Sequence, residues 1–227
     1  MSFAIMDAAR ISSRRIPTIV LAVSMVLTSS SVAYAGDEKG HDELDARVQA
    51  FLEKNRHAWR DMNVPMSDGQ LLFDVIVEGG YTRALEIGTS TGHSGIWIAW
   101  ALAKTGGKLI TVEIDERRYR EALANFEEAG LGDVVDARLA DAHVLVSEIE
   151  GPFDFVFVDA DKDWYVRYFE MVLLKLEPGG CFTAHNVTTR RGGWVSEFLE
   201  ALYATPGLET EIHESGNGLS VSFLEER

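Results

Sequence analysis

A glycine-rich loop between two acidic residues carries the clearest chemical information in this sequence. Glu86 closes a short apolar run, glycines follow at positions 88, 92 and 95, and Glu113 ends the next apolar run. Glycines let a backbone turn tightly and approach a ligand, and a helix that starts after such a turn offers free N–H groups. A carboxylate at the end of the second strand can accept hydrogen bonds from both hydroxyls of a ribose. The segment therefore predicts a cradle for a ribose-containing ligand.

The spacing of these glycines distinguishes between ligands. A dinucleotide fingerprint has glycines at relative positions 1, 3 and 6, whereas Gly88, Gly92 and Gly95 fall at relative positions 1, 5 and 8. This spacing argues against a pyrophosphate-binding NAD site. Asp141-Ala142, after the third expected strand, is placed to contact the edge of an adenine, although an Asp before a helix is also a common N-cap.

A second cluster combines two carboxylates with a lysine. Asp159, Asp161 and Lys162 follow the apolar run 155–158. Asn186 ends the next apolar run. Ligands of parallel sheets bind beyond the carboxyl ends of the strands, so these side chains are expected to meet. Because carboxylates hold hard cations and a neighbouring lysine can assist proton transfer, the cluster predicts a cleft with a cation and a base.

From residue 84 onward, expected strands alternate with expected helices. The strands are expected at 84–87, 108–113, 134–139, 153–159 and 181–186, and the helices at 93–103, 116–129, 142–149, 164–176 and 193–203. The alternation predicts an α/β fold with a parallel sheet covered by helices on both faces. Segments 209–213 and 219–224 predict a C-terminal hairpin. Before this region, one amphipathic helix starts near residue 44, and another runs from an N-cap at Ser67 or Asp68 to Gly79-Gly80.

The composition is that of one globular domain with a sizeable core, expected over residues 36–227. Of 227 residues, 46% are hydrophobic and 25% are charged. The formal net charge of −15 repels phosphate backbones and anionic lipids, so no nucleic acid or membrane-surface partner is expected. Cys181 is the only cysteine, which excludes an intrachain disulfide and a multi-cysteine zinc site. The histidines His57, His143 and His213 are interpreted as ordinary surface or helix residues.

The first 35 residues differ in character from the rest. Three arginines precede an apolar run over 16–27, and the small residues Ala33 and Ala35 follow it. This order predicts a signal peptide over 1–35 and therefore an exported, periplasmic or secreted protein. The apolar run is short for a membrane span, but an uncleaved N-terminal anchor stays open. If translation instead starts at Met25, the protein is cytoplasmic.

Several ordered segments together resemble the cation-dependent small-molecule O-methyltransferases. This group of class I S-adenosylmethionine-dependent enzymes includes caffeoyl-CoA and catechol O-methyltransferases. The matching segments are NVP at 63–65, DGQ at 68–70, EIGTSTGHS at 86–94, VDADKD at 158–163 and GG at 179–180. The similarity covers residues 42–226. It implies a Rossmann-like methyltransferase fold with a seven-stranded, mostly parallel sheet and an antiparallel C-terminal hairpin.

The resemblance also implies roles for individual residues. Asp159 is expected to be a metal ligand, and Lys162 is expected to assist deprotonation of the substrate hydroxyl. S-adenosyl-L-methionine is the expected cofactor, in a pocket lined by Val64, Glu86, Gly88, Thr89, Ser94, Glu113, Asp141, Ala142 and Asp161. A divalent cation on a substrate oxygen would favour the ionised hydroxyl, which attacks the sulfonium methyl group.

One position departs from the family pattern. The fifth strand of the family normally ends in Asp-Asn, whereas this chain has His185-Asn186. The expected metal ligands are therefore Asp159, His185 and Asn186, and the imidazole favours manganese, iron, cobalt, nickel or zinc over magnesium. In the alternative, His185 simply fills the position, no metal binds, and Lys162 alone assists deprotonation.

Three functions stay open. The leading one is methyl transfer from S-adenosylmethionine to a hydroxyl of a small, catechol-like aromatic molecule. The second is an exported binding protein that keeps the pocket but has lost catalysis, because an exported enzyme would need a supply of a cofactor that is made in the cytoplasm. The third is an NAD-dependent Rossmann enzyme, which the glycine spacing disfavours. The expected partners are a hydroxylated small molecule and, since relatives often form dimers, a second copy of the chain.

Overall fold

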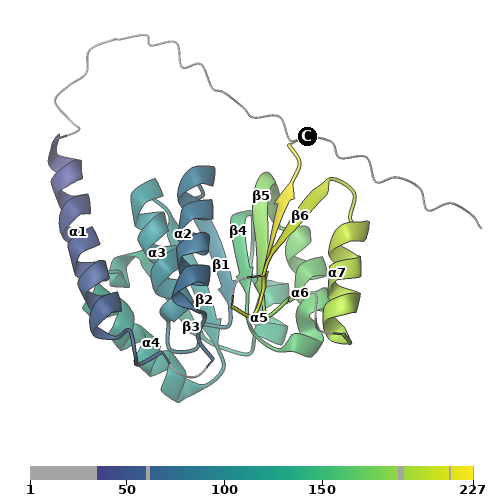
Figure 1. The fold of residues 1–227 in the computed structure, drawn as a ribbon, viewed down its shortest axis with the longest axis horizontal. Helices are drawn as coiled ribbons and strands as arrows, with labels where there is room; N and C mark the ends of the chain where they lie inside the picture. The colour runs from purple at the N-terminus through teal and green to yellow at the C-terminus, as the bar shows by residue number, and fades with distance from the viewer. Residues whose placement is uncertain (1–34, 60–61, 189–191, 215, 227) are drawn as a thin grey trace, which may run out of the picture.

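The computed structural model describes residues 35–59, 62–188, 192–214 and 216–226 (Figure 1). The expected signal peptide therefore lies outside the described residues, apart from Ala35. Within the described ranges, no helix is long and apolar enough to cross a membrane. The strands are β1 (Arg83–Ile87), β2 (Lys108–Glu113), β3 (Val135–Leu139), β4 (Phe153–Val158), β5 (Leu176–His185), β6 (Leu208–His213) and β7 (Leu219–Leu224). The helices are α1 (Ala35–Lys54), α2 (Met66–Gly79), α3 (His93–Thr105), α4 (Glu116–Ala129), α5 (Ala142–Glu148), α6 (Tyr165–Leu173) and α7 (Trp194–Ala204), with short 3-10 turns at Gly132–Val134 and Lys162–Trp164.

All seven strands form one sheet. Their order is β3-β2-β1-β4-β5-β7-β6. The pairs among β1 to β5 are parallel, and β7 runs antiparallel to both β5 and β6. The carboxyl ends of the five parallel strands therefore meet at one edge, and the hairpin extends the sheet beyond β5. The predicted α/β fold with a seven-stranded, mostly parallel sheet and a C-terminal hairpin is confirmed.

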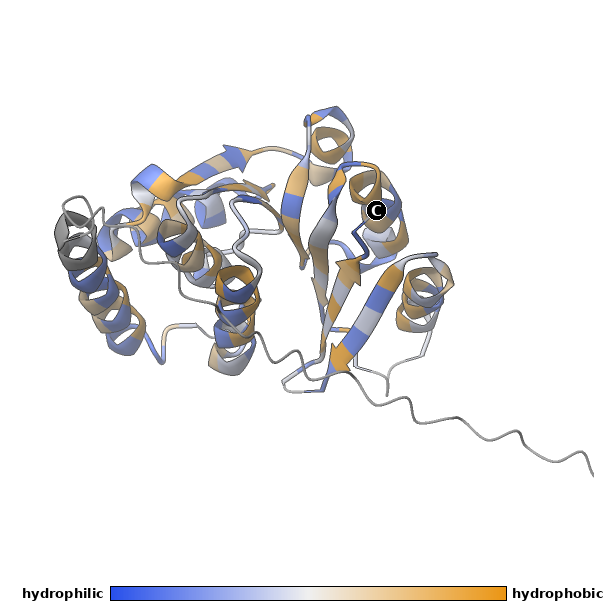
Figure 2. Ribbon diagram, turned by 90° about the horizontal axis from the view of Figure 1, so that it is seen from above, coloured by the Kyte–Doolittle hydropathy of each residue, from blue (hydrophilic) through white to orange (hydrophobic). Residues whose placement is uncertain are grey.

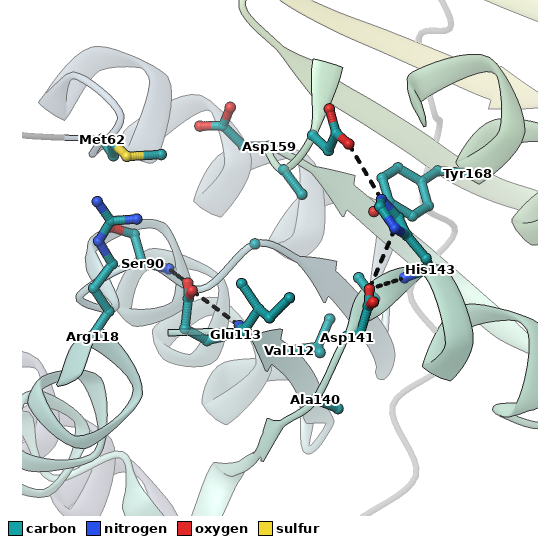
Figure 3. A pocket seen from close by; sticks show the side chains of 15 residues that line it. Met62, Ser90, Val112, Glu113, Arg118, Ala140, Asp141, His143, Asp159 and Tyr168 are labelled. Atoms are coloured by element: carbon teal, nitrogen blue, oxygen red, sulfur yellow. Dashed lines mark hydrogen bonds and ion pairs between the residues drawn. The ribbon is translucent and has the colours of Figure 1, made fainter. Parts of the chain in front are cut away.

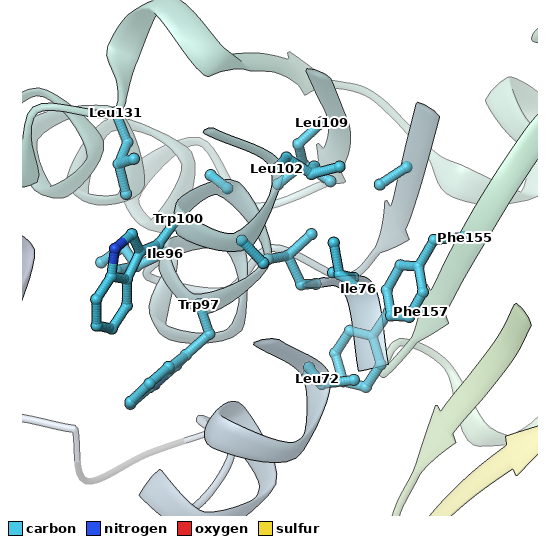
Figure 4. Packing of buried hydrophobic residues seen from close by; sticks show 14 of the residues in the cluster. Leu72, Ile76, Ile96, Trp97, Trp100, Leu102, Leu109, Leu131, Phe155 and Phe157 are labelled. Atoms are coloured by element: carbon cyan, nitrogen blue, oxygen red, sulfur yellow. The ribbon is translucent and has the colours of Figure 1, made fainter. Parts of the chain in front are cut away.

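Helices cover both faces of the sheet, and side chains of the central strands alternate between the two cores. On β4, Phe155 and Phe157 point to the face covered by α2 and α3, where they pack near Leu72 and Ile76 (Figure 4). Val156 and Val158 belong to the other core, under α5, α6 and α7. A strand buried on both faces reads as a continuous apolar run. Figure 2 shows the helices on the two sides striped in orange and blue, as expected for amphipathic helices.

The start of β5 differs from the prediction. We expected a helix to residue 176 and a strand from residue 181, but α6 ends at Leu173 and β5 begins at Leu176. The sequence Pro178-Gly179-Gly180 suggests a turn. In the structure these residues form an irregularity inside the strand: Leu176 pairs with Phe153, and the register then shifts before the next pairs. Glycine and proline are tolerated at such bulges, so the strand continues through residues that would end it by local sequence rules alone.

A buried carboxylate joins the central strands to α3. Glu86 on β1 is fully buried. Its Oε1 accepts a hydrogen bond from Ser94 Oγ and its Oε2 accepts one from Thr111 Oγ1, each at 2.6 Å. A Cβ on Gly95 would lie 2.9 Å from Glu86 Oε2, so α3 approaches the strand closely only because this residue is glycine. Burial raises the pKa of Glu86 to about 7, and the two hydroxyl donors only partly offset it.

This raised pKa predicts a pH-dependent stability. The fold favours the protonated carboxyl, so the contribution of Glu86 is present below pH 4.5 and is lost as pH rises through about 7. The variant Glu86→Gln cannot ionise, so it does not lose this contribution as pH rises. The difference in free energy of unfolding, variant minus wild type, should therefore increase by roughly 1–3 kcal/mol from pH 5 to pH 8. Urea unfolding at both pH values measures the difference, with Glu121→Gln on the exposed side of α4 as the matched control. A Glu86→Gln difference that is the same at both pH values would contradict the assignment.

Candidate active site

A cavity of about 350 Å³ opens beyond the carboxyl ends of the first four strands (Figure 3). Six of the residues predicted from the sequence line it: Gly88, Glu113, Asp141, Ala142, Asp159 and Asp161. They come from the loops that follow β1, β2, β3 and β4, because those loops leave the same edge of the sheet. Sequence reasoning missed other lining side chains, among them Met62, Arg118, His143 and Tyr168.

Gly88 lines this cavity at the end of β1. Its φ is 103°, and a Cβ there would lie 2.6 Å from the backbone oxygen of Asp159. Its N–H and that of Thr89 both donate to the carbonyl of Val112 at 3.1 Å. The loop is therefore held between the ends of β2 and β4, and a side chain at position 88 would close this approach.

Glu113 presents a fixed carboxylate to the cavity. Its Oε2 accepts a hydrogen bond from the N–H of Ser90 at 2.7 Å, and its Oε1 accepts two from the N–H groups of Ile114 and Asp115 at 3.0 and 2.9 Å. The residue is 7% exposed. A carboxylate has about four acceptor positions, so three donors orient it and still leave acceptor capacity toward the cavity. The remaining position suits a hydroxyl donor such as one of a ribose.

The interpretation of His143 as an ordinary histidine is wrong, because it lines the cavity. Its Nδ1 lies 3.5 Å from Asp141 Oδ1, and its Nε2 lies 3.3 Å from Asp161 Oδ2 (Figure 3). The ring also stacks on Trp164, with centroids 3.8 Å apart and planes 17° apart. Asp141 is both a lining residue and the N-cap of α5, where it accepts a hydrogen bond from the N–H of His143. The one available sequence signal for His143 was its place directly after Asp141-Ala142.

Four predicted cofactor residues lie beneath the cavity and are not among its lining residues: Val64, Glu86, Thr89 and Ser94. Thr89 Oγ1 shares a hydrogen bond with Thr111 Oγ1 at 2.6 Å, and Ser94 bonds Glu86. The carbonyl of Val64 lies 2.9 Å from His93 Nδ1. Burial lowers the pKa of His93 to about 4, so a neutral ring joins the segment before α2 to the start of α3. These residues support the loop from below, and their contact with a cofactor stays a prediction.

Lys162 stands between this cavity and a second one. Its Nζ donates to Asp159 Oδ1 and, at 2.8 Å, to the hydroxyl of Tyr165. Burial raises the pKa of Tyr165 well above its usual value, so the hydroxyl stays protonated and donates to a backbone carbonyl such as that of His185. The second cavity, of about 290 Å³, is lined by Lys162 together with Tyr165, Arg167 and Trp194 among others. The Asp159–Lys162 pair therefore lies where the two cavities approach each other.

The predicted metal ligand His185 is held by two carboxylates. Its Nδ1 lies 3.1 Å from Asp159 Oδ2, and its Nε2 lies 3.0 Å from Asp68 Oδ2. Burial opposes protonation of the ring, but the hydrogen bonds and charges of both carboxylates outweigh it and raise the pKa of His185. Burial also opposes ionisation of Asp159, yet His185 and Lys162 keep its pKa below the usual value. Asp68, His185 and Asp159 therefore form a buried ionic network.

Asp68 enters this network from α2, which corrects its expected role. The sequence suggested Ser67 or Asp68 as an N-cap, but α2 begins after Pro65 and has no side-chain cap. The Asp68 side chain is fully buried and turned toward His185. Its partner lies 117 residues away in the sequence, so no local pattern could identify the pair.

These residues do not fit the predicted metal site. A histidine ligand needs a ring nitrogen with a free lone pair, and both nitrogens of His185 face carboxylate oxygens. Asp159 directs its other oxygen to Lys162. Among the residues that the structure describes, no group of three or more His, Cys, Asp or Glu side chains can hold a metal ion.

Known proteins share both the sequence and this fold. A family model described as O-methyltransferase matches residues 39–200. The catechol O-methyltransferase of Niastella koreensis is 44% identical over 158 residues, which cover 68% of this chain and 71% of the relative. Caffeoyl-CoA O-methyltransferase 1 of Eucalyptus globulus is 32% identical over 236 residues, which cover 85% of this chain and 95% of the relative. The crystal structure of an O-methyltransferase from Bacillus cereus in complex with SAH has a TM-score of 0.70 and 28% identity, over 84% of this chain and 97% of that chain. Since the family model spans most of the sequence, as the resemblance of the motifs predicted, the chain belongs to the O-methyltransferase family.

Proposed function

We propose that the protein is an S-adenosylmethionine-dependent O-methyltransferase that acts on a hydroxyl of a small, catechol-like aromatic molecule. The observation that carries this proposal is the fixed carboxylate of Glu113 in a cavity that ends at the Asp159–Lys162 pair. The family membership supports methyl transfer to oxygen, and the relatives named for catechol and caffeoyl-CoA support an aromatic substrate.

The residues of the first cavity fit the cofactor. Glu113 has acceptor capacity left for a ribose hydroxyl, and Gly88 lets the loop after β1 pack against the backbone of Asp159 at the edge of the cavity. Ser90 lines the same cavity with a φ of 48°, and its buried hydroxyl has no hydrogen-bond partner among the described residues. A strained residue with an unpaired polar atom at a pocket is typical of a ligand-binding loop.

The other end of the cavity suits the base of the cofactor. Asp141 and Asp161 fix the His143 ring, and Trp164 stacks on it. The N–H of an adenine amino group can donate to the remaining carboxylate acceptors, and the ring of Tyr168, which also lines the cavity, favours an aromatic neighbour. We infer that His143 and Asp141 form the edge of the position that the adenine occupies.

Lys162 faces the position where the substrate must react. When bound, S-adenosylmethionine supplies an electrophilic methyl group on sulfur. Asp159 lines the first cavity and Lys162 lines the second, so a hydroxyl in the second cavity meets the Lys162 ammonium. A fixed positive charge stabilises the ionised hydroxyl at the position where negative charge develops. Tyr165 and Asp159 hold the ammonium in place.

The size and lining of the second cavity favour a small substrate. Its volume of about 290 Å³ suits one aromatic ring with small substituents. The walls include the rings of Tyr165 and Trp194, which meet edge to face at 4.8 Å. The other lining residues are Val166 and the charged Lys162, Asp163, Arg167, Glu170 and Glu197, which can contact the polar substituents of a ring. We infer that a single-ring catechol fits this cavity.

Two binding measurements separate this function from its alternatives. Calorimetric titration with S-adenosylhomocysteine and with NAD distinguishes a methyltransferase from a dinucleotide enzyme. A methyl-transfer assay on a panel of catechols then distinguishes an enzyme from an exported binding protein. Tight binding of NAD would contradict the proposal, and so would binding of S-adenosylhomocysteine without transfer to any catechol. Light scattering on the same sample tests the expected homodimer.

Replacing Glu113 tests the cofactor site. Glu113→Ala should weaken S-adenosylhomocysteine binding by about 1.5–3 kcal/mol, the usual scale for a lost charge-assisted hydrogen bond. Isothermal titration calorimetry measures the change. The exposed Glu116, which pairs with Arg120 on α4, supplies the control variant Glu116→Ala. Unchanged affinity in Glu113→Ala would remove this residue from the site.

Replacing Lys162 tests the reaction centre. Lys162→Met should lower kcat about 10²- to 10⁴-fold, because the positive charge next to the substrate oxygen is lost. Its affinity for S-adenosylhomocysteine should stay close to that of the wild type, since Lys162 is not among the lining residues of the first cavity. Steady-state kinetics and calorimetry measure both quantities. The exposed Lys54→Met is the control, and a variant with normal kcat would exclude Lys162 from catalysis.

We also propose that residues 1–35 are an export signal. Their basic, apolar and small-residue order supports this assignment. Fractionation of the native host and N-terminal sequencing should find the mature chain outside the cytoplasm, starting at Gly36. A cytoplasmic chain that still carries Met1, or that starts at Met25, would refute the proposal.

A further inference from the structure

The position of the family's cation site is occupied here by a ring that belongs to the chain. His185 ends β5, and its two nitrogens face Asp159 from β4 and Asp68 from α2. We propose that this clamp of Asp68, His185 and Asp159 takes the place of the divalent cation, so that the protein transfers methyl groups without binding one. That methyl groups are transferred rests on the proposed function. That no cation takes part rests on the geometry of the clamp.

The geometry uses every direction in which the ring could bind a metal. An imidazole binds metals through the lone pair of a ring nitrogen, in the plane of the ring. The carboxylate oxygens stand at 3.1 Å from Nδ1 and 3.0 Å from Nε2. A doubly protonated ring donates to both carboxylates, and a neutral ring donates to one and accepts from the other if that carboxyl is protonated. Both nitrogens are engaged in either case, so the argument does not depend on the charge of the ring.

Burial makes the clamp a permanent part of the fold. The His185 side chain is 3% exposed, that of Asp68 is 0% exposed and that of Asp159 is 15% exposed. Removing one partner from a buried, hydrogen-bonded pair leaves the other uncompensated, which is strongly unfavourable. A metal that recruited His185 would have to break one of these two pairs. The turn between β6 and β7 also packs over the clamp, since a Cβ on Gly216 would lie 2.9 Å from Asp68 Oδ2.

The chain supplies at this place the positive charge that a metal would bring. Asp159 contacts the His185 ring through Oδ2 and the Lys162 ammonium through Oδ1. Lys162 is partly exposed at the second cavity, so its charge can reach a substrate oxygen. Asp68 touches neither cavity, and we assign it as a positioning residue that holds His185, which in turn holds Asp159 against Lys162.

Manganese binding gives a test that does not depend on activity. Electron paramagnetic resonance of free Mn²⁺ is recorded while wild type, His185→Asp and the control His41→Asp on α1 are added. At a Mn²⁺ concentration of about 0.1 mM, the wild type and the control should leave the signal of the free ion unchanged, because any site that they have is weaker than this concentration. The variant His185→Asp replaces the ring with oxygen ligands beside Asp159 and Asp68, and it should bind Mn²⁺ at least about tenfold more tightly than the wild type.

The methyl-transfer assay on a catechol supplies the second readout. Wild-type activity should survive chelator treatment within about twofold, and added Mg²⁺, Mn²⁺ or Zn²⁺ should not raise it by more than this factor. Stoichiometric binding of Mn²⁺ by the wild type would overturn the inference. Activity that is lost on chelation and restored by a cation would overturn it as well.

Failure of the proposed function stays distinguishable from failure of this inference. Absence of S-adenosylhomocysteine binding in calorimetry would contradict the function and leave the manganese measurement intact. If His185→Asp does not fold, as judged by circular dichroism, the milder Asp68→Asn tests the clamp, because it weakens one side of it. If Asp68 has only a structural role, the substitution Asp68→Asn should lower the free energy of unfolding and leave the kinetics unchanged. The proposed positioning role instead predicts a lower kcat with unchanged affinity for S-adenosylhomocysteine. An unchanged kcat in Asp68→Asn would contradict the positioning role.

Discussion

Each buried carboxylate at the carboxyl edge of the sheet must find hydrogen-bond donors, because an ionised group without partners is expensive to bury. Glu86 uses two side-chain hydroxyls, and its pKa shows that they only partly satisfy it. Glu113 uses three backbone N–H groups, and Asp159 uses Lys162 and His185. The kind of donor decides what each carboxylate can do. Hydroxyl donors leave a buried, structural carboxylate, backbone donors leave an oriented acceptor at the first cavity, and cationic donors gather charge between the two cavities.

The sequence predicts the fold well where a single strand or helix carries its own signal. The apolar run of β4 and the glycine loop after β1 were placed correctly, because burial on both faces and tight turns leave a local pattern. The beginning of β5 could not be predicted, since the pairing of Leu176 with Phe153 across a bulge depends on another strand. Local rules describe what a segment prefers, and the neighbouring strand decides between a turn and a bulge.

The site follows the same division. The sequence predicted that Glu113, Asp141 and Asp159 lie together, because they stand at or just after strand ends and parallel strands bring their ends to one edge, and all three line the cavity. His143 and Asp68 were missed because their roles depend on partners from other elements. A histidine and an acid on separate helices look like ordinary surface residues until the fold brings their partners to them.

A site that is completed by its own chain differs physically from one that waits for an ion. Two neighbouring carboxylates such as Asp68 and Asp159 repel each other until a positive group arrives, and a metal provides that group only when it binds. The His185 ring is present as soon as β5 joins the sheet, so the pairing of both acids is part of folding itself. The same contacts fasten α2 to the strand ends, which fixes Asp159 and, through it, the Lys162 ammonium. Preorganised charge needs little rearrangement during a reaction, so in the proposed reaction these protein groups alone would hold the Lys162 ammonium in place.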